Sequence, residues 1–118
     1  MKKTKSIKLN KDFKRLYYRG KSVVRGNVVI YALKNRNNAN RLGITCGKTI
    51  GKAVKRNRVK RLLREGYRIL EDRLQSGYDI VLVARTRAVT SKEKHIIRDL
   101  EFAFSELGMF INNENIVD

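Results

Sequence analysis

The stretch that begins at about Ala53 carries the strongest periodicity in the chain and predicts one long amphipathic helix. Its apolar residues recur three and four positions apart, which places them on a single buried face. They are Val59, Leu62, Leu63, Gly66, Tyr67, Leu70 and Leu74. Because an apolar face of this length must pack against another element, the rest of the chain has to fold around this helix.

The opposite side of the same predicted helix is basic. Asn57, Arg61, Arg64 and Arg68 fall in one row, with Arg56, Arg58 and Lys60 beside it. Like charges one turn apart destabilise a helix, and only Glu65 comes close to interrupting the row. A solvated face without a partner would explain a basic row, but repulsion tolerated over several turns favours a polyanionic partner. Asn57 adds a directional donor and acceptor to this row of charges.

The composition and charge of the chain limit the kinds of partner that it can bind. The 118 residues fit a single domain, and 28 Lys and Arg against 11 acids give a net charge of +17, which is typical of proteins that bind nucleic acid or an anionic membrane. The longest apolar run, residues 80–84, is too short to cross a bilayer, and the helices need their apolar faces for the core. Residues 1–9 are basic and lack the apolar region of a secretory signal, so we expect a cytoplasmic protein.

The remaining elements follow from shorter patterns. Asn10 is a predicted N-cap of a helix that stops at Gly20, and Thr90 with Glu93 predicts a capping box for a last helix that stops at Gly108. We expect residues 1–9 to be a flexible basic arm and residues 111–118 a flexible tail.

Three runs read as strands. Residues 27–34 alternate, so that Val29 and Tyr31 point to one side, and with residues 41–46 they predict an antiparallel hairpin closed by a polar loop. Residues 78–85 are almost continuously apolar, which predicts a central strand. A strand, the basic helix and this strand in succession predict a crossover within one sheet.

The aromatic residues have two interpretations. Phe13 and Tyr17 lie one turn apart on the first predicted helix, and with Tyr31 they either fill the core or line a groove in which unpaired bases stack. Lys48 precedes the basic helix, where a backbone phosphate binds well. The spacing of a nucleotide-binding P-loop is absent, so we reject that function.

The sequence indicates no catalytic or metal-binding residues of its own. Carboxylates are scattered, and the single His95 stands among basic residues and reads as a surface residue. The single cysteine, Cys46, excludes an internal disulfide and a multi-cysteine metal site, and we expect it to be a small buried residue. A binding module therefore fits better than an autonomous enzyme.

Residues 41–65, R-L-G-I-T-C-G-K-T-I-G-K-A-V-K-R-N-R-V-K-R-L-L-R-E, closely resemble the signature of the bacterial ribonuclease P protein subunit. The central R-N-R, the preceding G-K-A-V and the following K-R-L-L-R-E make the resemblance specific. Asp12 with Phe13, residues 30–32 and residues 79–85 also have counterparts in that family, so nearly the whole chain is covered.

The resemblance implies a small α/β sandwich of order α-β-β-β-α-β-α, with a left-handed crossover through the basic helix, as one RNA-binding domain over residues 1–118. It implies a protein that joins a catalytic RNA and assists endonucleolytic removal of the 5′ leader from precursor tRNA. The RNA would carry out the hydrolysis with bound magnesium, and no obligate protein partner is evident.

The resemblance also implies two sets of site residues. Contacts to RNA would come from the basic helix, and an adjoining cleft would hold the single-stranded leader. The RNA-binding set is Arg56, Asn57, Arg58, Lys60, Arg61 and Arg64, with Arg68 continuing the row, and the cleft set is Phe13, Tyr17, Val29, Tyr31 and Lys48. Gly47 and Thr49 depart from the more polar or basic residues of many members, which leaves Lys48 as the phosphate contact in that loop.

Two other functions compete with this interpretation. A ribosomal protein would share the size, the charge and RNA binding, and only the R-N-R pattern separates the two. A nuclease that acts without RNA is the competitor from a different class, and it would cut precursor tRNA by itself.

Overall fold

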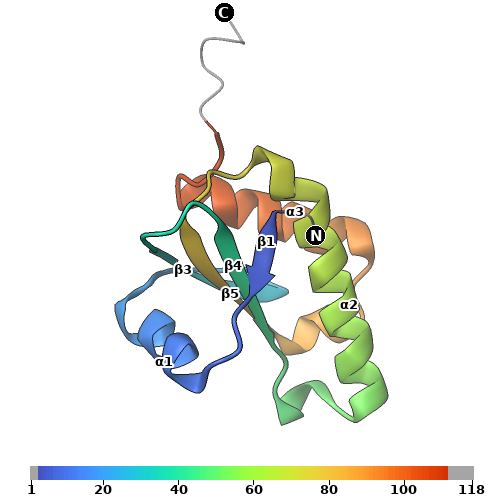
Figure 1. Ribbon diagram of the computed structural model, residues 1–118. Coiled ribbons are helices and arrows are strands. Elements are labelled where there is room, and N and C mark those ends of the chain that lie inside the picture. The colour runs from blue at the N-terminus through green and yellow to red at the C-terminus, as the bar shows by residue number, and fades with distance from the viewer. Residues whose placement is uncertain (1–2, 112–118) are drawn as a thin grey trace, which may run out of the picture.

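Five strands and three α-helices make up the fold over residues 3–111, the part of the chain that the computed structural model describes (Figure 1). Short 3-10 helices at Lys48–Ile50, Glu71–Arg73 and Thr86–Val89 connect some of them. In chain order the main elements are β1 (Thr4–Ser6), α1 (Asn10–Arg19), β2 (Lys21–Val24), β3 (Val28–Lys34), β4 (Asn40–Thr45), α2 (Ala53–Leu70), β5 (Tyr78–Ala84) and α3 (Glu93–Glu106).

The strands form one mixed sheet in the order β1-β4-β5-β3-β2. β5 is central and mostly buried, as its apolar run predicted, with β4 parallel on one side and β3 antiparallel on the other. The predicted hairpin of β3 with β4 is therefore wrong. An apolar strand needs neighbours on both sides, and the loop over residues 35–39 is long enough to span the ~10 Å between strands that flank a third.

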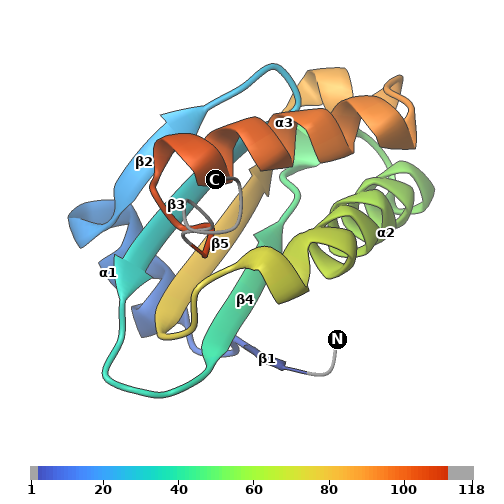
Figure 2. The ribbon, with the colours of Figure 1, turned by 90° about the horizontal axis from the view of Figure 1, so that it is seen from above.

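Helices α2 and α3 cover one face of the sheet and α1 covers part of the other (Figure 2). The apolar face predicted for α2 is confirmed, with Val59, Leu63, Tyr67 and Leu70 almost fully buried. Gly66 permits close packing against α3, because a β-carbon there would lie 2.8 Å from Cδ1 of Leu100. No helix within residues 3–111 combines the length and apolar character needed to span a membrane.

The β4-α2-β5 unit joins two parallel neighbouring strands through a helix, so the predicted crossover within one sheet is confirmed. Its left hand stays a prediction from the resemblance. The order of elements agrees with the expected α-β-β-β-α-β-α, preceded by one strand that we did not predict.

That extra strand corrects the expectation of a loose N-terminal arm. β1 pairs in parallel with β4, and Ile7 directly after it is buried against the sheet. Thr4 Oγ1 lies 2.8 Å from the hydroxyl of Tyr67 on α2 and also donates a hydrogen bond to Glu71. Part of the predicted arm thus closes the edge of the sheet, while residues 1–2 and residues 112–118 of the predicted tail lie outside the described residues.

The helix stops were predicted better than the helix starts. Gly20 ends α1, and Gly108, with a φ of 69°, follows the end of α3. Asn10 is the first helical residue rather than the cap, and Thr90 donates its hydroxyl to the carbonyl of Arg87 instead of capping α3. Both predicted caps are therefore wrong, since neither side chain reaches the amides of its helix.

Candidate nucleic-acid interface

The sheet face on the α1 side is organised in rows that run across β3, β5 and β4. Residues paired in register point to the same face, so each row places three side-chain positions side by side. The first row is Leu33, Asp79 and Arg41, the second is Tyr31, Val81 and Gly43, and the third is Val29, Val83 and Thr45. Along the sheet, the first row carries charged side chains, the second lies beside aromatic rings, and the third is only partly buried.

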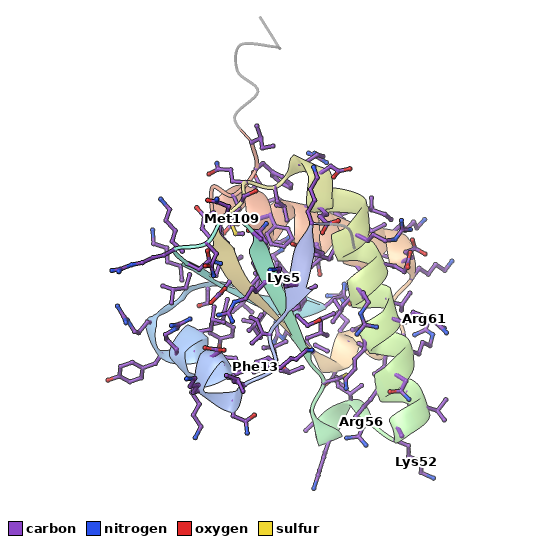
Figure 3. All side chains as sticks on the ribbon, viewed as in Figure 1. Lys5, Phe13, Lys52, Arg56, Arg61 and Met109 are labelled. Carbon is purple, nitrogen blue, oxygen red and sulfur yellow. The ribbon has the colours of Figure 1, made fainter. Side chains whose placement is uncertain are left out.

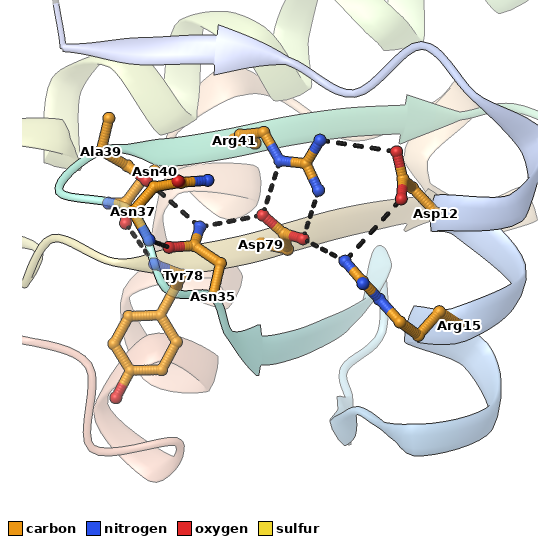
Figure 4. Close-up of polar contacts among 9 residues, drawn as sticks. All are labelled: Asp12, Arg15, Asn35, Asn37, Ala39, Asn40, Arg41, Tyr78 and Asp79. Atoms are coloured by element: carbon orange, nitrogen blue, oxygen red, sulfur yellow. Dashed lines mark hydrogen bonds and ion pairs between the residues drawn. The ribbon is translucent and has the colours of Figure 1, made fainter.

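The first row fastens α1 to the sheet through Asp79, which is 1% exposed (Figure 4). Arg41 donates from Nε and Nη2 to its two carboxylate oxygens at 2.8 and 2.6 Å, and Arg15 of α1 donates at 3.0 Å. Asn35 adds a hydrogen bond at 2.9 Å, and Asp12 lies 3.4 Å from Arg41. This ion-pair cluster fixes the position of α1 over one end of the sheet.

Opposing effects act on the pKa of Asp79. Burial by itself would raise it, but the hydrogen bonds from Arg41 and Asn35 and the nearby positive charges outweigh burial and hold the pKa below its ordinary value. The carboxylate is therefore ionised at neutral pH, and it neutralises much of the charge on Arg41 and Arg15.

The second row carries the aromatic side chains. The Phe13 ring lies against the backbone of Gly43, where a β-carbon would approach to 2.6 Å. Tyr17 meets Tyr31 edge to face, with 5.0 Å between ring centroids and 74° between ring planes. Tyr17 is 42% exposed and Tyr31 is half-buried, so these rings are not closed into the core. The groove interpretation thus gains an accessible aromatic surface.

The third row is an open floor beside the rings. Val29, Val83 and Thr45 are each only partly buried. α1 is anchored over the first row, and it contributes Phe13 and Tyr17 to the second. Lys48 follows Thr45 by three positions and is exposed at the start of the 3-10 helix that comes after β4. Aromatic rings and a mostly apolar, partly buried floor therefore lie next to each other on this face, and Lys48 follows beyond the end of β4.

The basic row of α2 is largely free of internal partners. The side chains of Asn57, Arg61 and Arg64 are exposed and form no hydrogen bond or ion pair with other residues in the described range 3–111. Figure 3 shows Arg61 pointing away from α2, with Lys52 and Arg56 at its N-terminal end. Arg68 differs, because its guanidinium pairs with Glu65 at 2.9 Å.

The two flanks of the basic row turn toward different neighbours. On one flank, Lys60 and Arg64 join Phe13 and Gly43 in lining a hollow of about 190 Å³ between α2 and α1, next to β1. On the other, Arg58 donates a hydrogen bond at 2.9 Å to the carbonyl of Val89, ahead of α3. The hollow makes the basic helix and the aromatic row one continuous surface.

Cys46 lies near Lys60 and Arg56 of α2. Burial raises the pKa of its thiol, while the charges of Lys60 and Arg56 oppose that rise. The side chain is half-buried and packs at the edge of the main core, so the expectation of a buried residue holds in part. The expectation of a surface position for His95 also holds in part, since it is half-buried in a basic notch at the start of α3.

Sequence reasoning missed several residues that shape this surface. Gly43 makes room for Phe13, Thr45 completes the open row, and Ser6 and Ile7 close the hollow. Glycine in a predicted strand is the one local signal that was available, since it marks close approach by another group. The roles of the others depend on which strands are neighbours.

Fold and surface together define a small, basic α/β nucleic-acid-binding module. The family model named Ribonuclease P matches residues 1–108. The "Ribonuclease P protein component" of Clostridium botulinum strain Langeland is 44% identical over 106 residues, covering 89% of this chain and 92% of that protein. The corresponding protein of Clostridium kluyveri is 46% identical over 106 residues, with 88% and 95% covered.

Solved structures agree. The RNase P protein of Staphylococcus aureus superposes with a TM-score of 0.81 at 34% identity, covering 90% of this chain and 97% of that one. The RNase P protein of Thermotoga maritima gives 0.75 at 28% identity, covering 83% and 93%. This chain belongs to the ribonuclease P protein family, which confirms the resemblance seen in its sequence.

Proposed function

We propose that this chain acts as the protein subunit of ribonuclease P, binding the catalytic RNA and the 5′ leader of precursor tRNA as a single RNA-binding domain. Family membership supports the subunit, since the relatives are named ribonuclease P protein components. The observation that carries the rest is the continuity of the largely unpaired basic row of α2 with the accessible aromatic side chains of α1 and β3, through the hollow lined by Phe13, Lys60 and Arg64. One surface can then hold a folded RNA and a loose strand together.

The basic face is assigned to the catalytic RNA. Folded RNA presents closely spaced phosphates, and arginines without internal partners can neutralise them without first breaking an ion pair. The assigned residues are Arg56, Asn57, Arg58, Lys60, Arg61, Arg64 and Arg68, the last of which must exchange Glu65 for a phosphate.

The leader is assigned to the aromatic row and open floor. An unpaired strand offers base faces for Phe13, Tyr17 and Tyr31 and an apolar contact for Val29, while Lys48 meets its backbone. Stacking on an aromatic side chain contributes roughly 1 to 3 kcal/mol per base and tolerates different sequences, which suits leaders that differ between tRNAs.

The chemistry is assigned to the RNA partner. Hydrolysis of the leader requires an activated water and stabilisation of the leaving oxygen, which magnesium ions held mainly by the RNA would supply. The protein contributes by offsetting repulsion between two RNAs and by holding the leader extended. We place this activity in the cytoplasm, as the sequence led us to expect.

The salt dependence of binding to the catalytic RNA tests the basic face. Each lost phosphate contact should reduce the slope of log K against log salt by about one unit, so Arg61→Ala with Arg64→Ala should reduce it by about two. Arg19→Ala with Lys21→Ala, two exposed cations at the junction of α1 and β2, is the matched control and should leave the slope unchanged. An equal effect of both pairs would contradict the assignment.

Two further measurements address the competing functions. RNA that copurifies with the protein should be one species of a few hundred nucleotides, whereas ribosomal RNA would indicate a ribosomal protein. Nuclease-treated, RNA-free protein should leave precursor tRNA uncut until the catalytic RNA is added. Cleavage without that RNA would place the active site in the protein.

A further inference from the structure

A second basic surface lies beyond the basic row of α2, on the side away from Phe13, Tyr17 and Tyr31. It is a notch of about 460 Å³ between the β2-β3 turn, the 3-10 helix Thr86–Val89 and the first turns of α3. Its walls include the cations Arg25, Arg87, Lys92 and Arg98, together with His95 and a single acid, Asp99. The predicted RNA-binding residues do not include any of them.

The acid in the notch is already neutralised. Asp99 lies 3.8 Å from Nε of Arg25 and accepts hydrogen bonds at 2.9 Å from both the backbone and the side-chain nitrogen of Asn27. Arg25 is held in turn by Phe102, with its guanidinium carbon 4.1 Å from the ring centroid. Arg25 and Asp99 therefore cancel, and the charge of the notch comes from the remaining cations.

None of these remaining cations is paired with an acidic side chain of the described residues. Arg87, Lys92 and Arg98 are exposed and form no ion pair with any residue between 3 and 111. Three like charges around one concave site repel one another, and a polyanion relieves that repulsion. Because a notch lined by charges of one sign focuses its positive potential, a phosphate-bearing strand should bind inside the notch better than on a flat surface with the same charges.

The notch is also pre-shaped. Asn27 is 4% exposed and connects three segments, since its side chain meets Asp99 and Ser91 and its carbonyl accepts from the amide of Arg85. Arg87 lies against Gly26, where a β-carbon would come within 3.0 Å of Nη1. Little ordering is then needed on binding, which favours affinity.

The notch and the basic row are joined. Arg58, in the R-N-R stretch of α2, donates to the carbonyl of Val89, one residue before Thr90 on the wall of the notch. The basic row and the notch are therefore adjacent at Arg58, and a nucleic-acid backbone that follows the basic row can continue into the notch.

We infer that this notch is a second RNA-phosphate site, at which the RNA bound along α2 continues past Arg58 onto Arg87, Lys92 and Arg98. The inference rests on the proposed function, since the occupant is the RNA already assigned to α2. It adds a surface on the opposite flank from the leader cleft, so the leader and this segment of RNA do not compete.

The experiment compares salt slopes for binding of the catalytic RNA alone. Arg87→Ala with Arg98→Ala should lower the slope by about two units, and Arg19→Ala with Lys21→Ala should leave it unchanged. Arg87→Lys with Arg98→Lys keeps the charge and should retain the native slope, which separates phosphate binding from a folding defect. Equal slopes for the notch pair and the control pair would overturn the inference.

Two arms identify the source of the phosphate and separate this inference from the proposed function. A reduced salt slope for binding of the catalytic RNA alone assigns the phosphate to that RNA and supports the inference. A salt slope that is reduced only when precursor tRNA binds the assembled enzyme would contradict the inference. If the notch pair has no effect while Arg61→Ala with Arg64→Ala still lowers the slope, this inference fails and the proposed function stands.

Discussion

The ring of Phe13 lies against Gly43 so closely that a β-carbon on Gly43 would be 2.6 Å from Cε1 and Cζ of the ring. Non-bonded carbons are essentially never that close, so any side chain at position 43 must displace the ring or the helix that carries it. The missing side chain of one strand residue therefore fixes where an aromatic ring of α1 can lie.

Gly43→Ala should weaken binding of precursor tRNA. We expect a loss of about tenfold, or ~1.4 kcal/mol, because displacement of Phe13 removes one stacking partner of the leader. Affinity for mature tRNA, measured in the same assembled enzyme, should stay unchanged.

Gly47→Ala is the matched control. Its β-carbon would meet nothing closer than the hydroxyl of Thr49 at 3.9 Å, so it changes backbone freedom by a similar amount without crowding. If Gly43→Ala and Gly47→Ala behave alike, the position of Phe13 has no influence on the leader.

Asp79→Asn should destabilise the protein by about 3 kcal/mol, because it removes the carboxylate that Arg41 and Arg15 share in a site with little solvent. Urea unfolding at neutral pH measures this loss. Asp72→Asn, which breaks only an exposed pair with Lys3, should change stability by less than ~1 kcal/mol.

The same carboxylate predicts a dependence on pH. Since the pKa of Asp79 is lower in the folded protein than its ordinary value near 3.8, its contribution is present above that value and is lost as the pH falls through the folded pKa. The difference in unfolding free energy between the native protein and Asp79→Asn should therefore be constant from pH 7 to pH 5 and narrow below about pH 4. A constant difference down to pH 2 would mean that folding does not lower the pKa of Asp79.

Gly66→Ala should destabilise the protein in spite of the helix propensity of alanine. Alanine gains about 1 kcal/mol in a helix, but its β-carbon would lie 2.8 Å from the fully buried Leu100, and overpacking costs roughly 1 to 3 kcal/mol. A double-mutant cycle with Leu100→Ala measures the coupling. Additive effects would show that Gly66 and Leu100 do not constrain each other.

Local patterns in the sequence predicted the elements that bury a long apolar face. The alternation in β3 placed Val29 and Tyr31 on one side, and the register of the sheet confirms it. The period of α2 located its buried face for the same reason, since both patterns report burial along a single element. β1 carried no such pattern, because its short sequence T-K-S has no apolar residue.

Relationships between elements were predicted less well. The hairpin of β3 with β4 followed from their nearness in the chain, whereas the sheet places β5 between them. The row of Val29, Val83 and Thr45 consequently exists only because three strands are neighbours, and no single stretch of sequence reveals it. The resemblance predicted a leader cleft lined by Phe13, Tyr17, Val29, Tyr31 and Lys48, and the sheet register places two of these, Val29 and Tyr31, on the face that α1 partly covers.

The affinity of the assembled enzyme for precursor and for mature tRNA, measured with Tyr31→Ala and with Tyr18→Ala, tests the account most directly. Tyr31 is half-buried beside Tyr17 on the leader face, whereas Tyr18 is 91% exposed on the same helix as Tyr17 and has no aromatic partner within residues 3–111. Tyr31→Ala should weaken precursor binding at least about fivefold, or ~1 kcal/mol, and leave mature tRNA unaffected, while Tyr18→Ala changes neither. An equal loss for precursor and mature tRNA, or a Tyr31→Ala enzyme that matches Tyr18→Ala, would contradict a leader site on this face.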